Sequence, residues 1–120
     1  MHPRLQKMHI SNRSKAIDED RIDWATAEAM AFASLNLEGY NTRLIGEDVE
    51  RGTFSQRHIV YHDQEKFGET FTPLQYNIDR SDKKLGRFQV LNTNLNEVGT
   101  MAYEYGYSLE SPKNLCMWEA

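Results

Sequence analysis

Three short apolar segments, each close to a helical segment, constrain the fold of this chain most strongly. Residues 41–46, 87–92 and 114–120 have the apolar composition and the length of short strands. Residues 20–39 and 95–110 are typical of helices, so the order is helix, strand, long loop, strand, helix, strand. Short apolar strands that alternate with helices favour a parallel sheet covered on both faces. We therefore predict an α/β fold with three layers and a parallel sheet.

The segment 20–39 carries the strongest helix signal. Asp23 is a suitable N-cap, the alanines favour helix, and Gly39 is placed to end it. Its apolar residues form a wide stripe, which predicts a helix covered on two sides. The stripe consists of Trp24, Ala27, Ala31 and Leu35, with Met30, Ala33 and Leu37 beside them.

The remaining segments are more polar. Residues 1–20 predict a connecting arm with a short helix, and residues 63–86 predict a long surface connection that ends in a charged turn. In the second predicted helix, Ala102, Tyr105 and Leu109 lie near one face.

The composition limits the classes of protein to consider. A chain of 120 residues, with 39% hydrophobic and 27% charged residues, suits one globular domain. Its net charge of −4 gives no case for binding nucleic acid or an anionic membrane. No apolar run approaches the roughly 20 residues of a membrane span. The single cysteine, Cys116, excludes an internal disulfide and fits a reducing compartment.

Two polar segments follow the first two predicted strands. Residues 46–58 and 92–97 both leave the carboxyl end of a strand, which is the edge where open parallel sheets bind ligands. Arg51 and Arg57 accompany His58, and this favours an anionic ligand. A hydrogen-bonded surface histidine without a ligand is the alternative for His58.

Glu97 begins the second predicted helix, where a carboxylate complements the helix dipole. The alternative is a buried carboxylate that faces a ligand nitrogen at the sheet edge. His58 and His62 are four residues apart, as in some zinc sites, but the Ile-Val-Tyr between them disfavours a helix. We therefore predict no metal site within the chain.

Three segments are informative when read together: "IDWATAEAMAF", "LIGEDVERGTFSQRHIVYHDQ" and "LNTNLNEVGTMAYEYGYSLESPKNLCMWEA". In order and spacing they resemble the pyrimidine-binding domain of the 2-oxoglutarate dehydrogenase first component, a thiamine-diphosphate-dependent decarboxylase of the transketolase-like group. The resemblance runs from about Leu5 onward, and "ERGTFSQRH" followed by "HDQ" is its most specific motif. It implies a connecting arm at 1–20 and the N-terminal part of a transketolase-like pyrimidine-binding domain at 21–120. The chain is then expected to be a fragment, truncated at its C-terminus.

The resemblance implies roles for three residues. Glu97 is similar to the carboxylate that hydrogen-bonds the cofactor's aminopyrimidine ring, although it lies in "LNE" where the family usually has Leu-Ser-Glu. Such a carboxyl group favours the imino tautomer, whose exocyclic nitrogen removes the thiazolium C2 proton. His58 is similar to the histidine that hydrogen-bonds the substrate. Glu47 is placed near the ring where the family has glutamine, and a glutamate donates a hydrogen bond only when protonated.

The implied activity is oxidative decarboxylation of 2-oxoglutarate in the tricarboxylic acid cycle. The 2-oxoadipate dehydrogenase of lysine degradation has nearly the same motifs and stays an alternative. A non-catalytic α/β interaction module is a second alternative, favoured by Glu47 and by the truncation. The presence of both Glu97 and His58 argues against such a module.

The implied cofactors are thiamine diphosphate and Mg²⁺. In the family, a different domain holds the diphosphate and the metal, so we expect this chain to be inactive by itself. The implied partners are the rest of the same polypeptide, a second protomer in a homodimer, the dihydrolipoamide succinyltransferase component and a small 2-oxo acid. The implied location is the mitochondrial matrix in a eukaryote and the cytoplasm otherwise.

Overall fold

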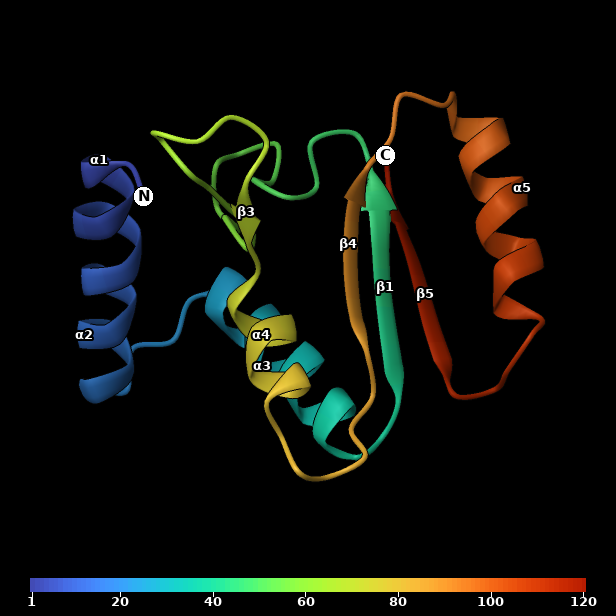
Figure 1. The fold of residues 1–120 in the computed structure, drawn as a ribbon, viewed down its shortest axis with the longest axis horizontal. Helices are drawn as coiled ribbons and strands as arrows, with labels where there is room; N and C mark the ends of the chain where they lie inside the picture. The colour runs from blue at the N-terminus through green and yellow to red at the C-terminus, as the bar shows by residue number, and fades with distance from the viewer.

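The structure, a computed structural model, describes residues 1–120. A parallel sheet forms its middle layer, with helices α3 and α4 on one side and helix α5 on the other (Figure 1). Helix α3 follows the arm and leads into the central strand, and α5 lies between the two later strands in the chain. The predicted three-layer α/β fold is confirmed.

The sheet has three parallel strands in the order β4-β1-β5. Their bounds are β1 (Asn41–Gly46), β4 (Phe88–Asn92) and β5 (Asn114–Glu119). Gly46 pairs in register with Asn92 on one side and with Glu119 on the other. The carboxyl ends of the three strands are therefore level, and the segments that leave them start side by side.

The other elements are mostly helical. They are α1 (Pro3–Leu5), the π-helical segment η1 (Gln6–Ser11), α2 (Asn12–Asp18), α3 (Trp24–Leu37), β2 (Tyr61–His62), β3 (Thr70–Phe71), α4 (Pro73–Asp79) and α5 (Glu97–Ser108). The first three run on as one helical rod, residues 3–18, which we call the arm and which stands at the left of Figure 1. No helix combines the length and the apolar character that a membrane crossing requires.

The main core lies between the sheet and helices α3 and α4. Its buried residues are Phe32, Leu44, Val49, Val60, Phe88 and Val90, and Ile59, Leu74, Ile78 and Met117 pack against them. Leu74 and Ile78 belong to α4, so the prediction of a long surface connection over 63–86 was wrong for this helix, which packs against the core. Pro73 starts this short helix. Leu74 and Ile78 are four residues apart, so both lie on the side of the helix that faces the core.

Helix α3 begins as predicted, because the Asp23 side chain accepts a hydrogen bond from the Thr26 backbone N–H at 2.7 Å. Its buried face differs from the predicted stripe. Phe32 and Asn36 face the sheet, whereas Trp24 is 93% exposed. Ala27 and Ala31 are exposed as well, since the sheet covers only one side of the helix and no element of this chain covers the other. The prediction of a helix covered on two sides was wrong for this chain.

Beneath α5 the sheet face is polar. Arg43 of β1 donates to the Glu104 carboxylate at 2.8–3.1 Å, and both side chains are buried. The Tyr107 ring lies 4.7 Å from the guanidinium carbon of Arg43. The hydrogen bonds to Glu104 outweigh burial and raise the pKa of Arg43. Ala102, Tyr105 and Leu109 lie on the outer face of α5 and are exposed.

Candidate active site at the carboxyl edge of the sheet

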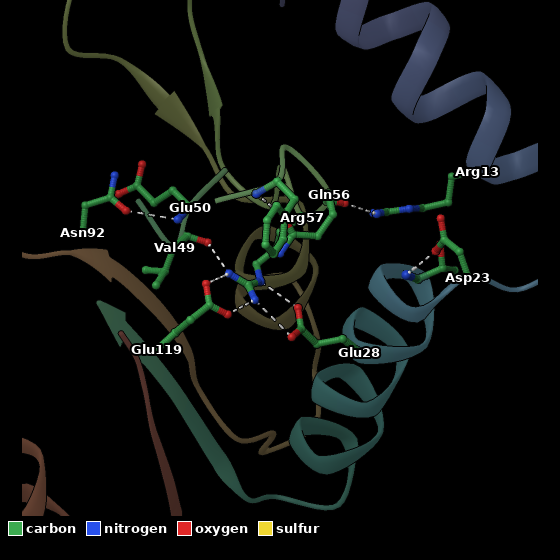
Figure 2. A network of polar contacts seen from close by, with 11 residues as sticks. Arg13, Asp23, Glu28, Val49, Glu50, Gln56, Arg57, Asn92 and Glu119 are labelled. Carbon is green, nitrogen blue, oxygen red and sulfur yellow. Dashed lines mark hydrogen bonds and ion pairs between the residues drawn. The ribbon is translucent and has the colours of Figure 1, made fainter. Parts of the chain in front are cut away.

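Two hydrogen bonds join the segments that leave β1 and β4. The Thr93 backbone N–H donates to the Gly46 carbonyl at 3.0 Å, and the Glu50 backbone N–H donates to the Asn92 side-chain oxygen at 3.0 Å. Figure 2 shows the second of these contacts. The two polar segments therefore meet at one edge of the sheet, as the sequence predicts.

Gly46 allows β1 and the loop that follows it to pack closely against the end of β5 and against Val49. A Cβ atom at this position would lie 1.9 Å from the Glu119 carbonyl oxygen and 2.9 Å from a Val49 methyl group. Any side chain would therefore push β5 away or displace the buried Val49. The closeness of this packing fixes where the following loop begins.

A buried arginine anchors that loop. The Arg57 guanidinium is 3% exposed and donates to Glu28 of α3 at 2.7 and 3.1 Å, and to Glu119 of β5 at 3.0 and 2.5 Å. It also donates to the Val49 carbonyl at 2.9 Å (Figure 2). Burial opposes its charge, but the hydrogen bonds to Glu119 and Glu28 prevail and raise the pKa of Arg57. Arg57 thus ties the loop to a helix and to the sheet.

His58 follows this anchor directly and adopts a left-handed backbone conformation, with a φ of +41°. Its ring is partly buried and lies edge-on to the His9 ring, with the centroids 5.2 Å apart. Burial, and then the charges of Arg51 and Arg13, lower the pKa of His58. His58 is therefore neutral at neutral pH and can donate or accept a hydrogen bond.

A cavity of about 310 Å³ adjoins His58. Its lining consists of Met1, Leu5, Asp48, Glu50, Arg51, His58, Val60, His62, Gln64 and Asn92. The charges are mixed: Arg51 pairs with Asp48 and also donates to Ser55, and His62 lies 3.2 Å from Glu50. A ligand with both charged and neutral polar groups suits this lining better than a simple anion.

Glu97 occupies the first turn of α5, but it does not cap the helix. The cap is Asn96, whose side-chain oxygen accepts from the Gly99 backbone N–H at 2.7 Å. Glu97 is exposed and forms no ion pair. The alternative prediction for Glu97, a buried carboxylate that faces a ligand, is therefore not met in this chain alone. Its carboxyl group is free for a partner that covers this edge.

Glu47 is also exposed and follows Gly46 at the end of β1. Neither Glu47 nor Glu97 lines the cavity beside His58. The structure thus places all three predicted residues at the carboxyl edge, but only His58 in the cavity. No group of three His, Cys, Asp or Glu side chains is arranged to hold a metal ion.

Sequence reasoning missed the two carboxylates that pair with Arg57, and it missed the contact between the His9 and His58 rings. Glu28 carried a usable signal, because it is the one charged residue of helix α3. Glu119 and His9 carried none, since their contacts join residues far apart in the chain.

Residues 20–120 match the family model for the transketolase pyrimidine-binding domain. The chain belongs to this family. The fold and the resemblance inferred from the motifs are both confirmed.

Named relatives match the whole chain. It is 50% identical over 122 residues to the mitochondrial 2-oxoglutarate dehydrogenase of Saccharomyces cerevisiae, and 44% identical over 120 residues to the 2-oxoglutarate dehydrogenase E1 component of Rickettsia conorii. It is 47% identical over 121 residues to the human 2-oxoadipate dehydrogenase complex component E1. In each case all of this chain is covered, but it spans only 11%, 12% and 13% of those relatives.

Proposed function

We propose that this pyrimidine-binding domain forms part of the active site of a thiamine-diphosphate-dependent 2-oxoglutarate dehydrogenase. The reaction is the oxidative decarboxylation of 2-oxoglutarate in the tricarboxylic acid cycle. The observation that supports this most is the 50% identity, along the whole chain, with a yeast protein of that name.

The residues at the carboxyl edge fit the pyrimidine ring of this cofactor. Glu97 has a free carboxyl group, and the exposed side chains of Leu95 and Val98 beside it offer apolar surface to a flat ring. Thiamine diphosphate, when bound, would supply a nucleophilic carbon, the C2 atom of its thiazolium ring. Glu97 would hold a proton at the ring nitrogen and so favour the imino form of the ring.

Glu47 and His58 have separate roles in this proposal. Glu47 would lie near the pyrimidine ring as a hydrogen-bond acceptor. His58, neutral and beside the cavity, would hydrogen-bond the 2-oxo acid and orient it. The loop that carries His58 is anchored by Arg57, so the backbone beside His58 is held in place before a substrate arrives.

Other parts of a longer protein would complete the site. Mg²⁺ and the diphosphate would be held by another domain, and a second protomer would form a homodimer with the first. The dihydrolipoamide succinyltransferase component would accept the product group. The location would be the mitochondrial matrix in a eukaryote and the cytoplasm otherwise.

A 2-oxoadipate dehydrogenase is the second candidate, because the human relative with that name is 47% identical over the whole chain. The two substrates differ by one methylene group, and a pocket separates such substrates by only about 10- to 200-fold. The test uses the full-length protein with thiamine diphosphate, Mg²⁺ and an artificial electron acceptor. We expect cofactor-dependent turnover with a higher kcat/KM for 2-oxoglutarate. A higher value for 2-oxoadipate would favour the second candidate, and no turnover of either would refute both.

A further inference from the structure

The arm, residues 3–18, precedes the residues that match the pyrimidine-binding domain family, yet it contacts the loop that carries His58. Only one arm residue is buried, and it is His9, at 9% exposure. The His9 ring lies edge-on to His58 at 5.2 Å and to Tyr61 at 6.4 Å between centroids. The arm therefore meets the site through a histidine.

A second contact lies one helical turn further along the arm. Arg13 donates from its guanidinium to the Gln56 carbonyl at 3.2 Å (Figure 2). Residues four apart lie on the same side of a helix, so His9 and Arg13 face the loop together. Gln56 is two residues before His58. The arm therefore holds the loop at two points, through Arg13 at Gln56 and through His9 at the His58 ring.

His58 depends on such neighbours for its orientation. Its backbone is in the left-handed region, and no hydrogen bond holds its ring. It lines the cavity of about 310 Å³ and also a second cavity of about 690 Å³; Leu5 of the arm lines both, and His9 lines the second. A ring that borders two cavities and has no hydrogen bond depends on packing for its orientation. The arm provides such packing through the edge contact of His9.

Packing alone does not explain a histidine at position 9. Its Nε2 is buried and has no hydrogen-bond partner, a cost that an apolar side chain of similar size would avoid. The His9 ring makes an aromatic edge contact with His58, which an aliphatic side chain cannot supply.

We infer that the arm is part of the active site, with His9 and Arg13 as positioning residues that hold His58 toward the 2-oxo acid. This inference rests on the proposed function of His58. The arm would then affect binding and orientation of the 2-oxo acid, and it would not affect proton removal from the cofactor's C2.

The test compares four variants of the full-length protein: His9→Leu, Arg13→Gln, Arg13→Lys and, as control, Lys7→Gln at an exposed arm position. We expect His9→Leu and Arg13→Gln to lower kcat/KM for the 2-oxo acid about tenfold, since small misplacements of a reacting group cost up to about 10²-fold. Arg13→Lys keeps the charge and is expected to retain most of the activity. Hydrogen–deuterium exchange at the cofactor's C2 should be unchanged in all four.

A second measurement does not depend on activity. Diethyl pyrocarbonate modifies neutral imidazole, and peptide mass spectrometry gives the rate for His58 at each pH. We expect faster modification of His58 in His9→Leu, because the ring is less covered. In Arg13→Gln the pKa of His58 should rise, because the charge of Arg13 helps to lower it.

The outcomes separate this inference from the proposed function. If both arm variants match Lys7→Gln in kcat/KM and in His58 modification, the arm is only a connection. A parallel loss of C2 exchange would also overturn the inference, because the damage would then be general. If the unsubstituted protein turns over no 2-oxo acid, the proposed function fails, and His58 modification still tests whether the arm holds the ring.

Discussion

At the amino end of the central sheet, a buried side-chain amide forms hydrogen bonds with the surrounding backbone. At the carboxyl end, the carboxylates of Glu47 and Glu97 are exposed and form no ion pair. Asn36 is 1% exposed and donates to the Tyr40 and Arg87 carbonyls at 2.9 and 3.0 Å, and the Thr42 hydroxyl donates to its side-chain oxygen at 3.4 Å. Gly86 packs so closely there that a Cβ atom would lie 1.9 Å from the Tyr40 carbonyl oxygen. The backbone at this end is therefore closely packed, and a buried side chain pairs with its polar groups.

The carboxyl end is built differently. Glu47 and Glu97 are exposed, and three non-glycine residues of the loop, Asp48, Ser55 and His58, have left-handed backbone conformations. Such conformations cost free energy and cluster where function requires them. The amino end therefore contributes to the stability of the fold. The carboxyl end contains strained backbone and exposed carboxylates, which cost stability but can bind a ligand. The following predictions test this division.

The largest effect is expected for Glu97→Gln in the full-length protein. The variant keeps the shape of the side chain but loses the acid, so hydrogen–deuterium exchange at the cofactor's C2 should slow by about 10²-fold or more. Stability should change by less than about 1 kcal/mol, because Asn96 caps the helix and Glu97 only complements its dipole.

His58→Ala is the matched control. It should lower turnover of the 2-oxo acid and leave C2 exchange nearly intact, because His58, unlike Glu97, lines the cavity that we propose for the substrate. Normal exchange in Glu97→Gln would leave this carboxylate without a chemical role.

At the opposite end, Asn36→Ala should destabilise the chain by about 1–3 kcal/mol, because it removes a buried amide and leaves the Tyr40 carbonyl without its donor, while the Arg87 carbonyl keeps the Thr42 backbone N–H. Urea unfolding measures this loss, and Ser34→Ala at an exposed position of the same helix is the control. In the full-length protein C2 exchange should not change. A large change in exchange with little loss of stability would contradict the division between the two ends.

The carboxyl end should also be sensitive to pH through His9. Burial, and then the charges of Arg13 and His58, lower the pKa of His9 from 6.5 to about 4. The unfolded chain then binds a proton that the folded chain does not, so stability falls as the pH decreases from 6.5 toward 4. We expect a loss of about 1 kcal/mol between pH 7.5 and 5.5.

Urea unfolding of the unsubstituted chain and of His9→Leu at the two pH values isolates the contribution of His9 to the free energy of unfolding. The contributions of the carboxylates are common to both chains and cancel in the difference. An equal loss in both chains would show that His9 is not responsible.

The smallest effect is expected for Trp24→Gln. Trp24 is 93% exposed and belongs to neither hydrogen-bonded end, so stability should change by less than about 0.5 kcal/mol. Phe32→Ala in the same helix is the contrast, with an expected loss of about 3–5 kcal/mol because Phe32 is in the core. A larger effect of Trp24→Gln, by thermal or urea unfolding, would mean that this side of the helix is covered in solution.

Local signals determined much of the fold from the sequence alone. Asp23 predicted the start of α3, and the apolar segments predicted all three strands within one or two residues. Both features depend on neighbours in the chain, through capping and through apolar composition. The meeting of residues 46–58 and 92–97 was also predictable, because parallel strands end at the same edge.

Only the tertiary structure decided which side of each helix is buried and which residues hold the site loop. Trp24 and Asn36 show the first point: the large apolar residue is exposed, and the polar amide is buried, since its side chain donates to two backbone carbonyls at the sheet's amino end. Arg57 shows the second, because its carboxylates lie 29 and 62 residues away in the chain. His9 reaches His58 only through the placement of the arm. Composition and periodicity describe each segment by itself, whereas these contacts depend on strand register and helix placement, which arise when the segments pack.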